Sequence, residues 1–218
     1  MVKVSLKILE SNKKIQDEIL RLIVGKVNKA SASCIKELSK ELMQEMRGWL
    51  QDSPVILSLL GSGTLNAEVG LPTSQGDTAA ASIIDAVVGS VEVEFKPFSK
   101  KMVGGLIVGI QPEDFRNILG LGSATITTAK GQKLDWLEWL LTAGSKIIVK
   151  DYELTYGNYG KRSRSGMGAI MVRKEGSGYW KMPAQYAGTP ENNFITRAFE
   201  GKDSIVSSII QKAFKSKI

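Results

Sequence analysis

The sequence predicts an α+β fold: a mainly antiparallel sheet with a long N-terminal helix and a C-terminal helix packed on it. Near the N-terminus, apolar residues recur every three or four positions over about 40 residues, which is the helical period. Four later segments alternate or read as apolar strands, namely 91–95, 104–110, 147–156 and 169–174. Because neither a repeat nor a strand–helix–strand rhythm occurs, we expect a single α+β domain over residues 1–218 without a parallel sheet.

The N-terminal segment begins with a strand pattern and continues as one long helix. Residues 2–8 alternate apolar and polar side chains, as a half-buried strand does. From Ser11, a plausible cap, the helical stripe continues over residues 11–52, with Gly25 as a point where it could bend or split. Pro54 ends it. Such a helix is long for this chain, and two interpretations remain open: it wraps over a sheet, or it projects to a neighbouring subunit.

The middle of the chain predicts short elements separated by turns. Val91–Phe95 and Gly104–Ile110 form a hairpin with a basic turn between them. Pro112 opens a short helix, since proline suits the first helical turn. The other expected elements are a helix over 54–60, a strand or irregular segment over 65–71, a polar loop over 73–78, a helix over 79–88, a strand over 124–128 and a Trp- and Leu-rich helix over 134–141.

The last third predicts two strands around a basic loop and then a helix. Segments 147–156 and 169–174 flank the loop 157–168, where four glycines and three cations cannot bury enough apolar surface to order themselves, so we expect a flexible loop. From Asn193 an amphipathic helix runs to the C-terminus, with Gly201 as its weak point.

Composition argues against an enzyme. The chain has no histidine, which excludes catalytic Ser-His or Cys-His pairs and histidine-ligated metals. Its single cysteine, Cys34, lies on the helical stripe and is expected to be buried. One cysteine forms no intrachain disulfide, and we find no signal peptide and no apolar run of membrane-spanning length. We therefore expect a non-enzymatic, soluble protein with no catalytic residues, cofactor or metal.

A local excess of positive charge marks a contact surface. Residues 157–181 contain six Lys and Arg side chains against Glu175 alone. The candidate interaction residues in this region are Lys161, Arg162, Arg164, Arg173 and Lys174. Such a cluster serves binding more than folding. Nearby Tyr152, Tyr156 and Tyr159 leave a second interpretation open, in which the basic hairpin 161–174 binds nucleic acid through phosphates and stacked bases.

Several segments resemble the neck, head–tail connector and tail-completion proteins of long-tailed bacteriophages. The segments are residues 53–60, 63–71, 131–141, 162–171, 179–183 and 187–198. Among them are Gly-Gln-Lys-Leu-Asp-Trp-Leu-Glu-Trp-Leu-Leu at 131–141 and Asn-Asn-Phe-Ile-Thr-Arg-Ala at 192–198. The likeness covers most of residues 50–200. These motifs carry no chemistry of their own.

The resemblance implies a structural virion protein. It implies a homo-oligomeric ring around the DNA channel, in contact with other neck, portal, adaptor or tail proteins and without a membrane partner. Whether the basic loop faces packaged DNA or protein stays open. Such a subunit is assembled in the host cytoplasm and located in the virion neck or tail. Ring closure needs two different patches per subunit, and the long helix and the basic hairpin are the candidates. Arg197 lies among apolar positions of the last helix and is a further candidate at a subunit boundary.

Overall fold

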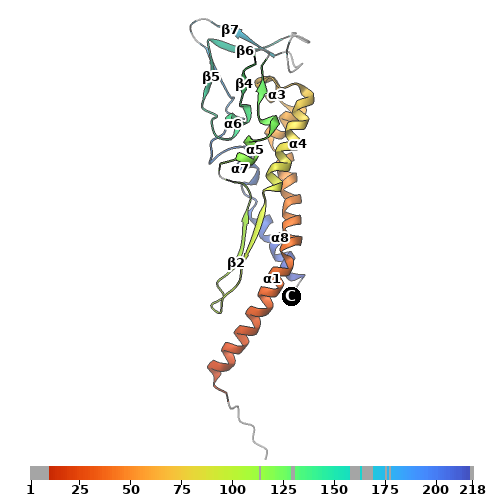
Figure 1. The fold of residues 1–218 in the computed structure, drawn as a ribbon, viewed down its shortest axis with the longest axis vertical. Coiled ribbons are helices and arrows are strands. Elements are labelled where there is room, and N and C mark those ends of the chain that lie inside the picture. The colour runs from red at the N-terminus through yellow and green to blue at the C-terminus, as the bar shows by residue number, and fades with distance from the viewer. Residues whose placement is uncertain are drawn as a thin grey trace, which may run out of the picture. The chain divides into compact units, whose positions relative to one another are not determined.

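The computed structural model describes residues 10–112, 114–128, 131–157, 163, 169–174, 176 and 178–216. The strand expected over residues 2–8 and most of the loop 157–168 lie outside these residues. The fold class is confirmed: helices alternate with short antiparallel strand pairs (Figure 1). The described strands form four two-stranded ladders in place of one continuous sheet.

The backbone divides into two compact units. The first unit comprises Met1–Glu41, Glu92–Gly109 and Ile205–Ile218, and the second comprises Leu42–Val91 and Ile110–Ser204. The single domain expected over residues 1–218 stays a prediction.

The long N-terminal helix is present as predicted. Helix α1 spans Asn12–Gln51 and continues through Gly25 without a break. Its buried positions advance in steps of four, at Ala30, Cys34, Leu38, Leu42, Met46 and Leu50. Because four residues turn an α-helix by slightly more than one revolution, this stripe winds around the helix instead of following one side. Cys34 is fully buried, as expected for a small apolar side chain.

The first unit combines part of α1 with a hairpin and a helix. Strands β1 (Glu92–Lys96) and β2 (Gly105–Gly109) form the predicted antiparallel hairpin. Asn28 of α1 holds the hairpin at Phe98, accepting from its amide at 2.8 Å and donating to its carbonyl at 3.1 Å. Helix α8 (Asp203–Lys215) lies beside α1, where Lys212 pairs with Glu41 (Figure 1).

The second unit contains the largest apolar core. Its helices are α2 (Pro54–Leu57), the π-helical turn η1 (Ser58–Ser62), α3 (Leu65–Val69), α4 (Thr73–Gly89), α5 (Arg116–Leu119), the 3-10 turn η2 (Gly122–Ala124), α6 (Trp136–Leu141) and α7 (Phe194–Phe199). Ser53 caps α2 by accepting from the amide of Ile56, and α2 begins at Pro54, where the sequence predicted a helix start. The Trp- and Leu-rich segment belongs to the core, because both Trp136 and Trp139 are buried.

Two predictions for residues 65–78 are wrong. Leu65–Leu71 is not a strand, since Leu65–Val69 forms α3, which ends at Gly70 in the left-handed conformation with φ 70°. The loop expected over 73–78 is the first part of α4, which begins directly after Pro72. Gly76 packs inside the helix against the Leu59 carbonyl oxygen and Asn66, where a side chain has no room.

Strands β5 to β8 make one interrupted ribbon. Strand β5 (Ile147–Lys150) pairs with β8 (Tyr179–Lys181), and β6 (Tyr152–Tyr156) pairs with β7 (Ala169–Arg173), all antiparallel. The predicted strand 147–156 is therefore divided at Asp151, whose φ is 60°. The Asp151 amide donates to the Gly178 carbonyl, and its own carbonyl accepts from the Lys174 amide, so this residue joins both ladders.

The remaining differences occur at helix ends and short strands. The helix expected to open at Pro112 begins only at Arg116, because Phe115 takes the left-handed conformation with φ 52°. Strand 124–128 is reduced to β3 (Ile126–Thr127), which pairs with β4 (Lys133–Leu134). The single C-terminal helix is two helices, α7 and α8, because Gly201, the predicted weak point, has φ 71°.

Candidate interaction surfaces

The structure describes only part of the predicted basic site. Lys161, Arg162 and Arg164 lie outside the described residues. Arg173 ends β7 opposite Tyr152, and Lys174 forms an ion pair of 2.6 Å with Glu153 on the neighbouring strand. Both cations are exposed. The ribbon therefore presents positive charge at this end, with Lys174 already partly compensated.

Arg197 lies on a different element and serves its own unit. It is exposed on α7 and donates through Nη1 to Asn192 Oδ1 at 3.1 Å and to the Ala187 carbonyl at 3.4 Å. Neither accepting group is a carboxylate. These bonds tie the segment before α7 to the helix, and the place of Arg197 at a subunit boundary stays a prediction.

The N-terminal part of α1 is an apolar helix surface without a cover among the described residues. Ile19, Leu22 and Ile23 are 50%, 57% and 44% exposed, and Leu20 is also exposed. On a helical projection Ile19, Leu22 and Ile23 share one side, whereas Asn28, which holds the hairpin, lies on another. We call Ile19, Leu20, Leu22 and Ile23 the α1 patch. An exposed apolar group of this size, surrounded by charged side chains, is typical of a protein contact.

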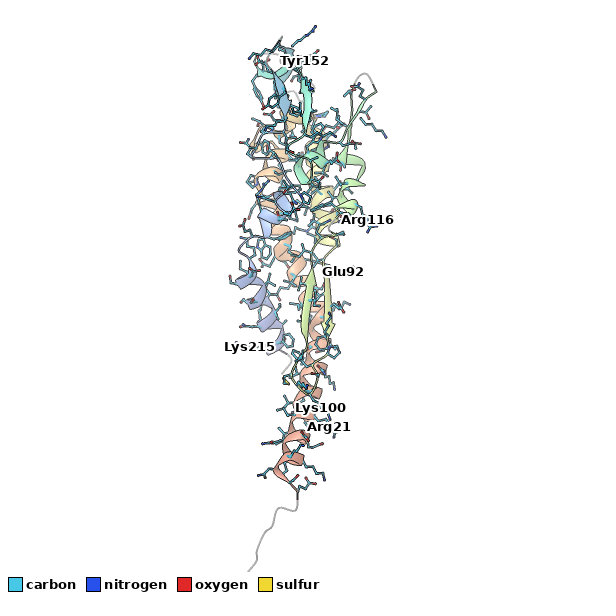
Figure 2. All side chains as sticks on the ribbon, turned by 90° about the vertical axis from the view of Figure 1, so that its left-hand side faces the viewer. Arg21, Glu92, Lys100, Arg116, Tyr152 and Lys215 are labelled. Atoms are coloured by element: carbon cyan, nitrogen blue, oxygen red, sulfur yellow. The ribbon has the colours of Figure 1, made fainter. Side chains whose placement is uncertain are left out.

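The turn of the β1–β2 hairpin exposes a second apolar group. Residues Ser99–Val103 form a closed turn in which the Ser99 carbonyl accepts from the Met102 amide and the Ser99 amide donates to the Val103 carbonyl, both at 2.9 Å. We call these five residues the hairpin tip. Met102 and Val103 at its end are 44% and 71% exposed. Figure 2 shows Lys100 of the tip near the stretch of α1 that carries Arg21.

An ion pair on α1, between Arg21 and Glu18, lies close to the hairpin tip. Arg21 donates to Glu18 at 2.6 Å, and this bond lowers the pKa of the Glu18 carboxyl. The positive charge of Lys100 lowers the same pKa further, which places the tip within electrostatic reach of α1.

Net charge separates between the two units. The segments of the first unit hold 15 Lys and Arg against 7 Asp and Glu, and those of the second unit hold 14 against 15. Outside residues 157–181, the second unit has 8 positive and 14 negative side chains. The strong local excess predicted at 157–181 is thus offset within its own unit, and the net positive charge of the chain belongs to the first unit.

A cleft in the second unit combines apolar walls with a carboxylate. It has a volume of about 480 Å³ and lies between α3, the β3–β4 pair and the ribbon. Its walls include Val69, Leu134, Trp139, Leu154 and Trp180. We call it the Glu68 cleft, because Glu68 supplies the charge. This volume and this lining are those of a binding cleft.

Two aromatic donors fix the Glu68 carboxylate. Tyr156 Oη donates to Oε1 at 2.7 Å, and Trp180 Nε1 donates to Oε2 at 3.3 Å. Burial raises the pKa of Tyr156, and the bond to Glu68 raises it further, so the phenol stays protonated. A carboxylate offers about four acceptor positions, so two remain beyond the bonds that the described residues make.

A second tyrosine, Tyr186, positions the segments that lead to Glu68. Tyr186 is buried, and its hydroxyl lies 3.1 Å from Ser58 Oγ and 3.4 Å from the Thr64 amide. Although burial raises the pKa of Tyr186, the hydrogen bonds from Ser58 and Thr64 outweigh it and the net shift is downward. These bonds fix η1 and the start of α3, which carries Glu68.

Sequence reasoning missed the Glu68 cleft and the hairpin tip. Glu68, Tyr156 and Trp180 are far apart in sequence, and only the fold brings them together. The tip did carry a signal, since two lysines followed by two apolar residues in a turn are unusual. In the described part of the chain, no group of three or more Cys, Asp or Glu side chains is arranged to hold a metal ion.

Comparison with known proteins adds no relative. No protein-family model, curated protein or solved structure matches the chain. Among the described helices, none combines the length and apolar character that crossing a membrane requires.

Proposed function

We propose that this chain is a structural subunit of a tailed-phage neck, a head–tail connector or tail-completion protein that assembles as a ring around the DNA channel. The observation that carries the proposal is the α1 patch. Ile19, Leu20, Leu22 and Ile23 stand on a helix whose stretch from Asn12 to Ile23 is almost entirely exposed. A subunit of an assembly needs such a surface, and an isolated soluble domain has no use for it.

The energetics support a partner for this helix end. An isolated helix as short as the stretch from Asn12 to Ile23 is only marginally stable in water, and most helical stability in proteins comes from packing. Within the described residues the stretch before Val24 gains little packing, since Ile15 is its one partly buried side chain. A neighbouring subunit that covers the α1 patch would supply the missing burial.

The resembling segments support the same proposal through their structural roles. Ser53 caps α2, Gly70 ends α3, and Asn193 caps α7. Gly188 lies so close to the Leu140 carbonyl that any side chain would clash. The motifs that resemble neck proteins are therefore the residues that build the second unit, as expected if the likeness reflects a shared fold.

A double substitution on the α1 patch tests the proposal. Ile19→Asp with Leu22→Asp should leave the subunit folded, because both side chains are exposed, and should abolish oligomers and the joining of heads to tails. The matched control, Asn12→Asp with Gln16→Asp, adds the same charge at exposed polar positions and should assemble normally. Normal head–tail joining by the first variant would count against the proposal.

DNA binding by the ribbon is the second candidate. Tyr152 and Tyr179 are exposed on the ribbon beside Lys150, Arg173 and Lys181, as in a surface on which bases stack between phosphate contacts. Titration of the protein with random duplex and single-stranded DNA over a salt series tests it. The candidate requires affinity that falls steeply as salt rises, and Arg173→Glu should reduce the slope by about one. Affinity that does not change with salt would remove this candidate.

A further inference from the structure

We propose that the hairpin tip of one copy inserts into the Glu68 cleft of a second copy, with Lys100 or Lys101 on the Glu68 carboxylate and Met102 and Val103 against the apolar walls. This inference rests on the proposed ring and names one of its contacts. It joins two different surfaces, so it is a head-to-tail contact of the kind that closes rings.

The tip has the structure of a built contact. Its turn is closed by backbone hydrogen bonds, and Asn28 anchors its base at Phe98. Gly104 follows the tip where a Cβ would lie 2.6 Å from Phe98 Cα, so the chain folds back tightly at this point. A shape held in this way loses little conformational entropy on binding.

The residues at the end of the tip are unfavourable for the free chain. Met102 has φ 57°, a left-handed conformation in which glycine or asparagine is normally found. Val103 is a β-branched apolar residue with 71% of its surface exposed. A turn that served only to connect two strands would be better formed by glycine and polar residues. Both apolar side chains therefore point to burial against a partner.

The Glu68 cleft offers what the tip lacks. Its carboxylate is positioned by Tyr156 and Trp180 and retains acceptor positions for an ammonium group. Val69, Leu154 and Trp139 provide apolar walls for methionine and valine side chains. A volume of about 480 Å³ accommodates a turn with two side chains, whereas it is too small for a helix such as α1.

The charges of the two units favour the same pairing. The tip belongs to a unit with a balance of 15 positive to 7 negative side chains. The cleft belongs to a unit with 14 positive against 15 negative side chains, so that unit carries almost no net charge. Like charges therefore disfavour tip-to-tip pairing, whereas the cleft presents the Glu68 carboxylate to the lysines of the tip.

Complementation between two inactive variants tests the contact. The tip variant is Met102→Asp with Val103→Asp, and the cleft variant is Glu68→Lys. We expect each purified protein to sediment as a monomer, with a dissociation constant raised at least about 100-fold. In an equal mixture, the tip variant supplies an intact cleft and the cleft variant supplies an intact tip. The two proteins should therefore form heterodimers and no rings. If the tip variant alone forms rings like the unsubstituted protein, the contact is wrong and the proposed ring still stands.

Further variants control for folding. Glu68→Lys removes the acceptors for Tyr156 and Trp180. Glu68→Gln keeps one acceptor oxygen and the size of the side chain, so it is the milder test and should weaken association about tenfold. Lys100→Glu with Lys101→Glu should prevent assembly, and adding Glu68→Lys to that chain should restore it. Failure of this charge exchange, with all proteins folded by circular dichroism, would overturn the contact. If the unsubstituted protein remains a monomer at its highest soluble concentration, the proposed ring fails together with the contact.

Discussion

Asn193 shows how one side chain can fix the start of a helix. It is fully buried, and its Oδ1 accepts from the amides of Ile195 and Thr196, while Thr196 Oγ1 accepts from the Asn193 amide. Its Nδ2 donates to the carbonyls of Thr189 and Pro190. The sequence predicted that the helix starts at Asn193, and in the structure this residue is the cap of α7.

Loss of this cap should destabilise the folded protein. Asn193→Ala removes two helix-capping bonds and the donor to the carbonyls of Thr189 and Pro190, so we expect the free energy of unfolding to fall by about 1–2 kcal/mol. Asn192→Ala, at the exposed neighbouring position, should change it by less than about 0.5 kcal/mol. Urea unfolding followed by tryptophan fluorescence measures both. Equal effects for the two variants would contradict the assigned cap.

Tyr156 should make stability depend on alkaline pH. Its pKa is raised in the folded protein by burial and by Glu68, so the unfolded chain loses this proton first as the pH passes about 10. The stabilisation from the protonated tyrosine is therefore fully present below that pH and is lost above it. Tyr156→Phe should show a smaller fall in melting temperature between about pH 9 and pH 11. An identical fall in both proteins would show that Tyr156 is not the group responsible.

Two helix glycines have opposite roles at the scale of elements. Gly76 lies within α4, and a Cβ there would meet the Leu59 carbonyl oxygen and Asn66 Nδ2, the latter at 2.8 Å. Gly48 lies within α1, where nothing comes within 4 Å of an added Cβ. Alanine is the better helix former at both positions, so packing decides the sign of the effect at Gly76.

The alanine substitutions give a paired prediction. Gly48→Ala should raise the free energy of unfolding by about 0.5–1 kcal/mol, because it only reduces the entropy of the unfolded chain. Gly76→Ala should lower it by roughly 1–3 kcal/mol, because α4 must move away from α3 and η1. Chemical denaturation of the two variants in parallel gives both values. A stabilised Gly76→Ala protein would mean that the approach of α4 to Leu59 is looser than described.

Elements with a local signal were predictable, and elements determined by distant contacts were not. Helix α1 and the β1–β2 hairpin follow from periodicity alone, and Pro54 and Asn193 mark helix starts by their own chemistry. The segment 65–78 misled because Gly76 suggests a loop, although it is a glycine that close packing requires. Likewise the Glu68 cleft depends on a pairing between α3 and the ribbon that no local pattern encodes.

For the whole molecule, the distribution of charge and apolar surface matters more than any single group. The sequence places a local charge excess at 157–181, but only the division into units shows that the first unit is basic and that the second is close to neutral. The α1 patch and the hairpin tip both belong to the basic unit. The proposed contact therefore joins the basic unit of one copy to the Glu68 cleft in the second unit of another, with the ribbon as the candidate for DNA.

The mass of the purified protein in solution, together with its image by electron microscopy, tests the central claim most directly. We expect a closed ring of identical subunits with a central channel, at a mass that is a whole multiple of 23.7 kDa. The ring should dissociate as salt rises, because charge complementarity contributes to its contacts. A folded protein that stays at 23.7 kDa at every soluble concentration, with no rings in the images, would contradict the account.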